Sequence, residues 1–252
     1  MFKHLLPALI FACFVFPSCQ SGEDNPPAVD FNLEGSDPQA IKVADEVMAA
    51  LGGRKNWDQT RYLSWSFFGV RQHYWDRYTG NVRIESPKDS TIFLMNINSM
   101  EGKVQKNGSL VDNPETLKQF LQRGKNAWIN DSYWLVMPFK LKDSGLTLKY
   151  EGEKKTENGE LADVLQLTFD RVGHTPLNKY EVFVDKESHL VTQWSYFPEA
   201  TDSIPRFTLP WEKYEKKGAI LLSGGRGKNE LSDIAVYDEL PESVFTSFDP
   251  VK

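Results

Sequence analysis

Residues that could carry out catalysis are few in this 252-residue chain, and they do not follow a spacing typical of an enzyme. Three histidines lie beyond the first twenty residues: His73, His174 and His189. They do not form the His-x-x-x-His or His-Glu-x-x-His spacing of a zinc site, and no Gly-x-Ser-x-Gly sequence marks a serine nucleophile. The sequence thus predicts neither a metal site nor a cofactor.

A catalytic alternative centres on His73. We expect His73, Trp75 and Arg77 on one face of a strand, beside Asp76, where an imidazole and a carboxylate could act as base and acid in a hydrolase. A barrel strand with ordinary pairings explains the same residues. Because the chain has 35 acidic residues, carboxylate pairs of the kind that glycosidases use are also expected by chance. We expect no enzyme and keep a hydrolase that uses His73 and Asp76 as an alternative.

Large apolar side chains that recur along the expected strands indicate a different kind of site. Aromatic residues and methionine line cavities for apolar ligands, which often lie in barrel mouths. We expect the mouth at Met137-Pro138-Phe139, because proline interrupts regular pairing and methionine adapts to varied apolar partners. Plain core packing would use the same residues, and both alternatives stay open. The candidate ligand-binding residues are Trp65, Phe67, Trp75, Phe93, Met95, Trp134, Met137, Phe139, Trp194 and Tyr196.

The first residues of the chain predict export and a lipid anchor. Lys3 and His4 precede an apolar run of twelve residues, 5–16, which is too short to span a bilayer and is typical of a secretory signal. Cys19 follows and begins a polar segment rich in proline and glycine, an arrangement that resembles the lipobox of bacterial lipoproteins. Phe16 and Pro17 depart from the Leu and the small residue usual there. The resemblance implies that Cys19 is acylated and becomes the N-terminus.

The remaining chain would then consist of a tether and a globular part. We assign 1–18 to the signal peptide, 19–36 to a flexible tether and 37–252 to a single domain. Cys13 and Cys19 are the two cysteines of the chain, which excludes an internal disulfide after cleavage. The net charge of −6, without a basic cluster, argues against nucleic acid as a partner.

Two helices are predicted. The first begins at Ser36 or Asp37 with Pro38 in its first turn, carries an apolar stripe from 41 to 51, and ends at Gly52-Gly53. The second begins at Asn113-Pro114 and is expected over residues 114–128.

Strands are predicted over most of the remaining chain. Alternating apolar residues mark 60–70, 71–78, 81–86 and 90–98, and Asn-Gly pairs at 107–108 and 158–159 predict tight turns. Further strands are expected near 146–156, 161–170, 179–185, 189–197, 206–215, 218–224 and 231–237, with turns at Lys216-Lys217 and Gly224-Gly225. The segment 223–228 lacks the first glycine and the Ser/Thr of a phosphate loop and is expected to be a flexible hairpin loop. About ten to twelve antiparallel strands must curl, so we predict a mainly β (α+β) fold, an unclosed antiparallel barrel whose concave face is covered by the two helices.

Three segments resemble those of uncharacterised bacterial lipoproteins related to the Lol-type carriers, which transport lipoproteins. They are Asp-Ser-Tyr-Trp-Leu-Val-Met-Pro-Phe-Lys-Leu-Lys-Asp at 131–143, the strand-turn-strand at 179–191, and Asp-Glu-Leu-Pro-Glu-Ser-Val-Phe at 238–245. The resemblance spans about residues 37–248. It implies a half-barrel with helices in its mouth and an apolar cavity that can hold acyl chains, and it leaves open whether this chain carries a ligand.

The first functional hypothesis is thus a lipid-anchored envelope protein, held at the outer membrane through its acyl chains, that binds a lipid or lipoprotein-like ligand. The alternative is a structural lipoprotein with a packed barrel that binds another envelope protein.

Overall fold

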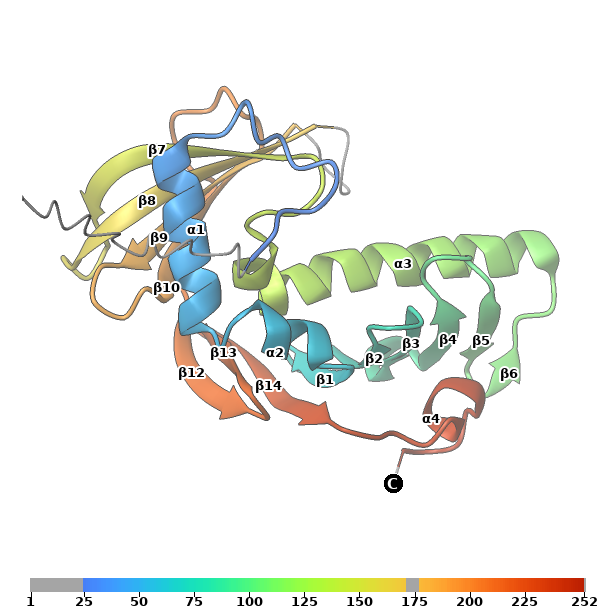
Figure 1. The fold of residues 1–252 in the computed structure, drawn as a ribbon. Coiled ribbons are helices and arrows are strands. Elements are labelled where there is room, and N and C mark those ends of the chain that lie inside the picture. Colours follow the sequence, from blue (N-terminus) through green and yellow to red (C-terminus); the bar gives the residue numbers. More distant parts are fainter. Residues whose placement is uncertain (1–24, 171–176, 252) are drawn as a thin grey trace, which may run out of the picture.

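The computed structural model describes residues 25–170 and 177–251, and its main feature is a pair of antiparallel sheets (Figure 1). The larger sheet has nine strands, in the spatial order β12 (Glu212–Lys217), β13 (Ile220–Arg226), β14 (Asn229–Tyr237), β1 (Tyr62–Phe67), β2 (Arg71–Asp76), β3 (Asn81–Ser86), β4 (Thr91–Asn96), β5 (Gly102–Lys106) and β6 (Ser109–Leu110). The smaller has five, in the order β11 (Phe207–Pro210), β10 (Val191–Phe197), β9 (Lys179–Asp185), β8 (Leu161–Phe169) and β7 (Leu146–Lys155).

The two sheets are joined at Trp211. Residues 206–215 were expected to form one strand, but β11 ends at Pro210 and β12 begins at Glu212, in the other sheet. Trp211 turns into the core, where it is 1% exposed, and its amide donates to the Thr192 carbonyl of β10. Burial of this indole thus bends the chain from one sheet into the other.

The sheets do not close into a barrel. Among the described residues, the outermost strands β6 and β7 are not paired with each other. The free edge of β7 is covered by the preceding chain, since the Asn32 amide donates to the Leu146 carbonyl and the Asp37 amide to the Leu148 carbonyl. The predicted fold, an open antiparallel half-barrel with helices, is confirmed, with fourteen strands in place of ten to twelve.

Residues 25–36 differ from the flexible tether expected there. Phe31 is 7% exposed and belongs to the main apolar core, and the Asn25 amide group donates to Asp45 at 2.8 Å. With the contacts to β7, these bonds hold the segment against the smaller sheet. Of the tether expected at 19–36, residues 25–36 are therefore part of the folded domain, and 19–24 lie outside the described residues.

The helices are α1 (Pro38–Ala50), α2 (Arg54–Gln59), α3 (Pro114–Val136) and α4 (Ser243–Thr246), with 3-10 turns η1 (Pro87–Asp89) and η2 (Met137–Lys140). The α1 helix has Pro38 in its first turn, as predicted, and packs on β7 and η2. The short helix α2 and the C-terminal α4 were not predicted, because neither has enough turns to show a periodic pattern.

Helix α3 begins as predicted and continues eight residues further than expected. The Asn113 carboxamide oxygen accepts from the Thr116 amide, which caps the helix N-terminus, and Pro114 follows. Its buried positions Leu121, Gly124, Asp131 and Leu135 share one face. The helix lies along the larger sheet, from η2 to β5 (Figure 1).

Two predicted turns have different outcomes. Asn107 and Gly108 have φ of 50° and 78° and join β5 to β6, which confirms the hairpin. The turn expected at Gly224-Gly225 is wrong, because both residues lie inside β13 and are buried. A Cβ on Gly224 would lie 2.5 Å from the Leu231 carbonyl oxygen, so glycine is required there by the close approach of β14. The loop expected at 223–228 is thus mostly buried strand.

Candidate functional site beneath helix α3

An aromatic cluster lies where the C-terminal half of α3 meets both sheets. We define it as Phe67, Phe68, Tyr133, Trp134, Tyr180, Trp194, Tyr196 and Phe207. Trp134 is central: its ring lies 4.7 Å from Trp194 and 5.3 Å from Phe68, both edge-on, and 5.8 Å from Phe207. Phe67, Trp134, Trp194 and Tyr196, four of the predicted ligand-binding residues, are thus brought together.

A second apolar region lies beneath the N-terminal half of the same helix. Phe93 and Met95 of β4 face Leu121 and Gly124, in a core cluster separate from the main one. A Cβ on Gly124 would lie 2.9 Å from both the Met95 sulfur and a Phe93 ring carbon. The helix therefore rests on two apolar regions, with close backbone approach at Gly124.

Trp75 lies between the two regions. Its ring meets Trp128 of α3 edge-on at 5.1 Å, and both indoles are in contact with the main cluster and the second one. Trp65 belongs to the main core and is fully buried. The predicted ligand-binding residues of the larger sheet thus follow the length of α3.

Met137 and Phe139 lie beyond the C-terminus of α3, in η2. Met137 is fully buried and Phe139 is 4% exposed, with its ring stacked on Trp57 at 4.2 Å. Pro138 is buried as well. This segment anchors the end of α3 in the main core, so it does not form the open mouth that the sequence predicted.

A buried polar cluster fixes α3 to strand β2. The Asp131 carboxylate of α3 is fully buried and accepts two bonds from Arg71, at 2.6 and 2.8 Å, and one from His73 Nε2 at 2.7 Å. The His73 ring is also fully buried and stacks on Trp65 with centroids 4.5 Å apart. Because a carboxylate only accepts, we assign the imidazole proton to Nε2.

Burial sets the ionisation of this cluster. It lowers the pKa of His73, an effect larger than the opposing effect of the hydrogen bond that His73 donates to Asp131. Burial also raises the pKa of Asp131, but hydrogen bonds from His73 and Arg71 outweigh it and leave that pKa below its ordinary value. The cluster is therefore a neutral imidazole and an ion pair between α3 and β2.

The catalytic alternative placed His73 beside Asp76, and this is wrong. Strand residues alternate between faces, so Asp76 lies on the other side of β2, where it is bonded to Arg61 at 2.9 Å. The acid beside His73 is Asp131, which the sequence analysis missed. The feature of the sequence that could have indicated Asp131 is a carboxylate on the apolar face of a helix, seven residues after Gly124 and four before Leu135.

Arg226 of β13 is a second buried cation against α3. Its guanidinium is fully buried, lies 3.4 Å from the centre of the Trp211 ring, and donates to the Trp134 carbonyl at 2.6 Å and to Ser223 Oγ at 2.9 Å. Burial lowers the pKa of Arg226 to about 9. Sequence analysis assigned this residue to a flexible loop and so missed its contact with the helix.

Buried polar atoms without a partner gather around α3. Nine such side-chain atoms occur among the described residues, and native proteins pair more than about 90% of buried polar groups. Seven belong to residues on α3 or facing it: Trp65, His73, Trp75, Trp128, Tyr133, Trp194 and Arg226. Four are indole N–H groups, which only donate. The interface between α3 and the sheets thus combines aromatic surface with several buried donors that lack acceptors.

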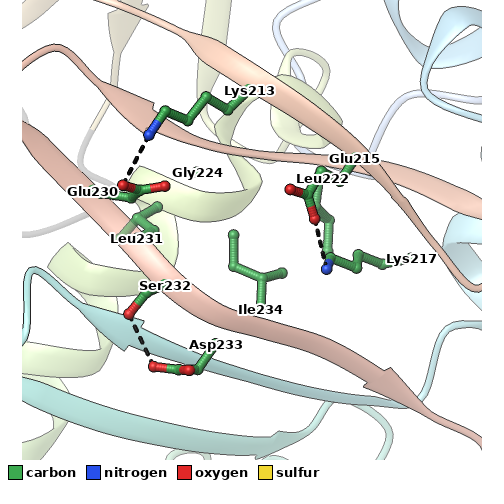
Figure 2. Close-up of a pocket in the computed structure, with 10 residues that line it drawn as sticks. All are labelled: Lys213, Glu215, Lys217, Leu222, Gly224, Glu230, Leu231, Ser232, Asp233 and Ile234. Atoms are coloured by element: carbon green, nitrogen blue, oxygen red, sulfur yellow. Dashed lines mark hydrogen bonds and ion pairs between the residues drawn. The ribbon is translucent and has the colours of Figure 1, made fainter.

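A surface pocket of about 210 Å³ lies elsewhere, between β12, β13 and β14 (Figure 2). Leu222, Leu231 and Ile234 form its apolar part. Two ion pairs flank it, Lys213 with Glu230 at 2.9 Å and Lys217 with Glu215 at 2.8 Å. None of the ten predicted ligand-binding residues lines this pocket, and its charged groups are already paired.

Metal and membrane features were also sought in the described structure. No group of three or more His, Cys, Asp and Glu side chains there is arranged to hold a metal ion. None of the helices of residues 25–170 and 177–251 is both long and apolar enough to cross a membrane.

The chain has structural likeness to several solved proteins. No protein-family model matches the sequence, and no curated protein matches it. A DUF1329 family protein from Desulfovibrio piger shares 13% identity with a TM-score of 0.45, over 83% of this chain and 98% of that one. A putative outer membrane lipoprotein-sorting protein domain from Vibrio parahaemolyticus shares 11% with a TM-score of 0.43, over 82% and 96%.

A LolA superfamily protein from Nitrosomonas europaea shares 11% identity with a TM-score of 0.38, over 82% of this chain and 97% of that one. At these sequence identities and TM-scores, the likeness concerns the arrangement of the chain and says nothing about a ligand.

Proposed function

We propose that this protein is a lipid-anchored envelope protein that binds an acyl-chain ligand between α3 and the concave face of the half-barrel. The observation that carries the proposal is the set of unpartnered donors within an aromatic lining. An acyl chain would pack on the aromatic rings, and its ester or amide carbonyl would accept from an indole N–H.

The way α3 is held supports the proposal. Its C-terminal half is fixed by Asp131 and by the bond from Arg226 to Trp134, both buried. Its N-terminal half rests on a separate apolar cluster and carries exposed polar residues on its other face. The two halves of the helix are thus held by different contacts, and Trp75 and Trp128 pack against both apolar clusters.

The test uses a Cys19→Ala variant, purified without its acyl chains. Native mass spectrometry of protein from the envelope should show a lipid-sized adduct. A brominated fatty acyl methyl ester should quench tryptophan fluorescence, since Trp134 and Trp194 are within contact range of the ligand. Trp134→Ala should weaken binding at least tenfold, whereas Tyr78→Ala, at an exposed position outside the aromatic cluster, should not change it.

A clean mass together with no quenching would contradict the proposal. That result would favour the alternative of a packed barrel that binds another envelope protein. The burial of Trp65, Met137 and Trp194, each at most 1% exposed, is the observation behind this alternative.

A further inference from the structure

Exposed apolar side chains concentrate at one end of the smaller sheet. Seven large apolar residues of the described chain are exposed, and four of them lie on loops at this end: Val29, Leu33, Leu177 and Ile204, which are 99%, 56%, 67% and 80% exposed. The other three, Tyr78, Leu110 and Leu161, lie on separate parts of the molecule. Such clustering of exposed apolar groups indicates an interaction surface.

Backbone hydrogen bonds show that the three loops share this end. The Gly145 amide, at the start of β7, donates to the Asp30 carbonyl, which places Val29 and Leu33 there. The Ala200 amide donates to the Leu177 carbonyl, which joins the loop after β10 to the start of β9. Ile204 follows on the loop into β11, and the segment 25–36 rises from beside η2 to the top of Figure 1, where the loop 198–206 lies.

The length of the chain before Asn25 limits how far this surface can be from a lipid anchor. Cys19 lies six residues before Asn25 and ten before Val29. At a maximum of about 3.6 Å per residue, these segments span at most about 22 Å and about 36 Å. An acylated Cys19 would thus keep the domain beside the bilayer and allow Val29 to reach its surface.

We propose that Val29, Leu33, Leu177 and Ile204 form a membrane-contacting surface that inserts into the interfacial region of a bilayer. The inference rests on the lipid anchor proposed above and is independent of ligand binding. The exposed charges on the same loops are mostly acidic, since Asp30, Glu34 and Glu199 outnumber Arg206, and this excess would disfavour anionic lipids. The surface therefore fits a bilayer of zwitterionic phospholipid, such as phosphatidylcholine or phosphatidylethanolamine.

The test uses single cysteines in the lipidated protein. Acylation blocks the Cys19 thiol and cleavage removes Cys13, so an introduced cysteine is the unique labelling site. Ile204→Cys and Val29→Cys, labelled with an environment-sensitive fluorophore, are reconstituted in phosphatidylcholine vesicles with and without a nitroxide-labelled lipid. Leu161→Cys is the matched control, since Leu161 is exposed at the opposite end of the same sheet.

We expect the nitroxide lipid to quench the label at 204 and 29 at least threefold more than the label at 161. Vesicles rich in phosphatidylglycerol should reduce the difference. Equal quenching at all three positions, or no quenching at 204 in protein that floats with the vesicles, would overturn the proposal and leave a protein partner for this surface. If the wild-type protein does not float with vesicles, the lipid anchor itself is wrong.

Discussion

At the scale of single residues, Asp131 explains how a polar group can be part of an apolar interface. Four N–H groups donate to its carboxylate, two from Arg71 and one each from His73 and Asn130, so hydrogen bonds offset the desolvation of the charge. The sequence placed His73 and Trp75 on one face of a strand from alternation alone. It could not reveal Asp131 as the partner of His73, because that contact joins residues 58 positions apart across two elements.

The first prediction concerns pH. Because the pKa of His73 is lowered in the folded state, the unfolded chain binds a proton more readily. The contribution of His73 to the free energy of unfolding is complete above about pH 6.5, the ordinary pKa of histidine. It is lost as the pH falls toward the pKa of the folded state, by up to about 1.4 kcal/mol per pH unit. Urea unfolding between pH 7.5 and 5.5 should therefore show a smaller loss of stability in His73→Phe than in wild type.

His189→Gln is the matched control, because His189 is exposed and its pairing with Glu46 is long, at 3.8 Å. This variant should keep the wild-type pH dependence. The prediction would be contradicted by parallel stability curves for wild type and His73→Phe over this range.

At the scale of elements, the ends of helices and strands were predicted where local signals exist. Asn113-Pro114 predicted the start of α3, and Asn107-Gly108 predicted a hairpin, because caps and positive φ are local requirements. The extension of α3 to Val136 and the break at Trp211 depend on what these residues pack against. Pro138 and Pro210 lie beside these breaks and are local stop signals, but the length of α3 and the turn of Trp211 into the core depend on tertiary packing.

The contact of α3 with β4 gives a second prediction. Gly124→Val should destabilise the fold by about 1–3 kcal/mol, because its Cβ would overlap the Met95 sulfur and a Phe93 ring carbon. Gln119→Val, at an exposed position on the same helix, controls for the helix propensity of valine. It should alter the free energy of unfolding by less than about 0.5 kcal/mol. Equal urea midpoints for the two variants would show that α3 does not approach β4 as closely as described.

At the scale of the whole molecule, the open half-barrel and the proposed lipid anchor make separate predictions. The fold class was predicted from strand number and spacing, since about ten twisted strands cannot stay flat. The ten candidate residues were selected by type, and the fold places four of them in the aromatic cluster and others along α3. Their burial could not be predicted, because alternation shows which face a residue occupies but not what covers that face.

The anchor is tested by Cys19→Ala. Two or three acyl chains bind a bilayer durably, at about 0.8 kcal/mol per buried methylene, whereas one apolar loop surface does not. The variant should move from the membrane to the soluble fraction after cell fractionation. Retention of most of the variant in washed membranes would contradict lipid anchoring, and Ser18→Ala serves as a control with the cysteine intact.

The pairing of β14 with β1 has a consequence for how the protein is made. Tyr62 pairs with Tyr237, so the centre of the larger sheet joins the first strand of the chain to the last. If the chain crosses a membrane starting from its N-terminus, β1 emerges early. It can pair with β14 only after all the other strands have emerged. Such distant pairing gives a high contact order and slow folding, on the order of milliseconds to seconds or longer. Until β14 is available, Leu63 and Trp65 would lack part of the core that buries them, and exposed apolar surface of this kind favours aggregation.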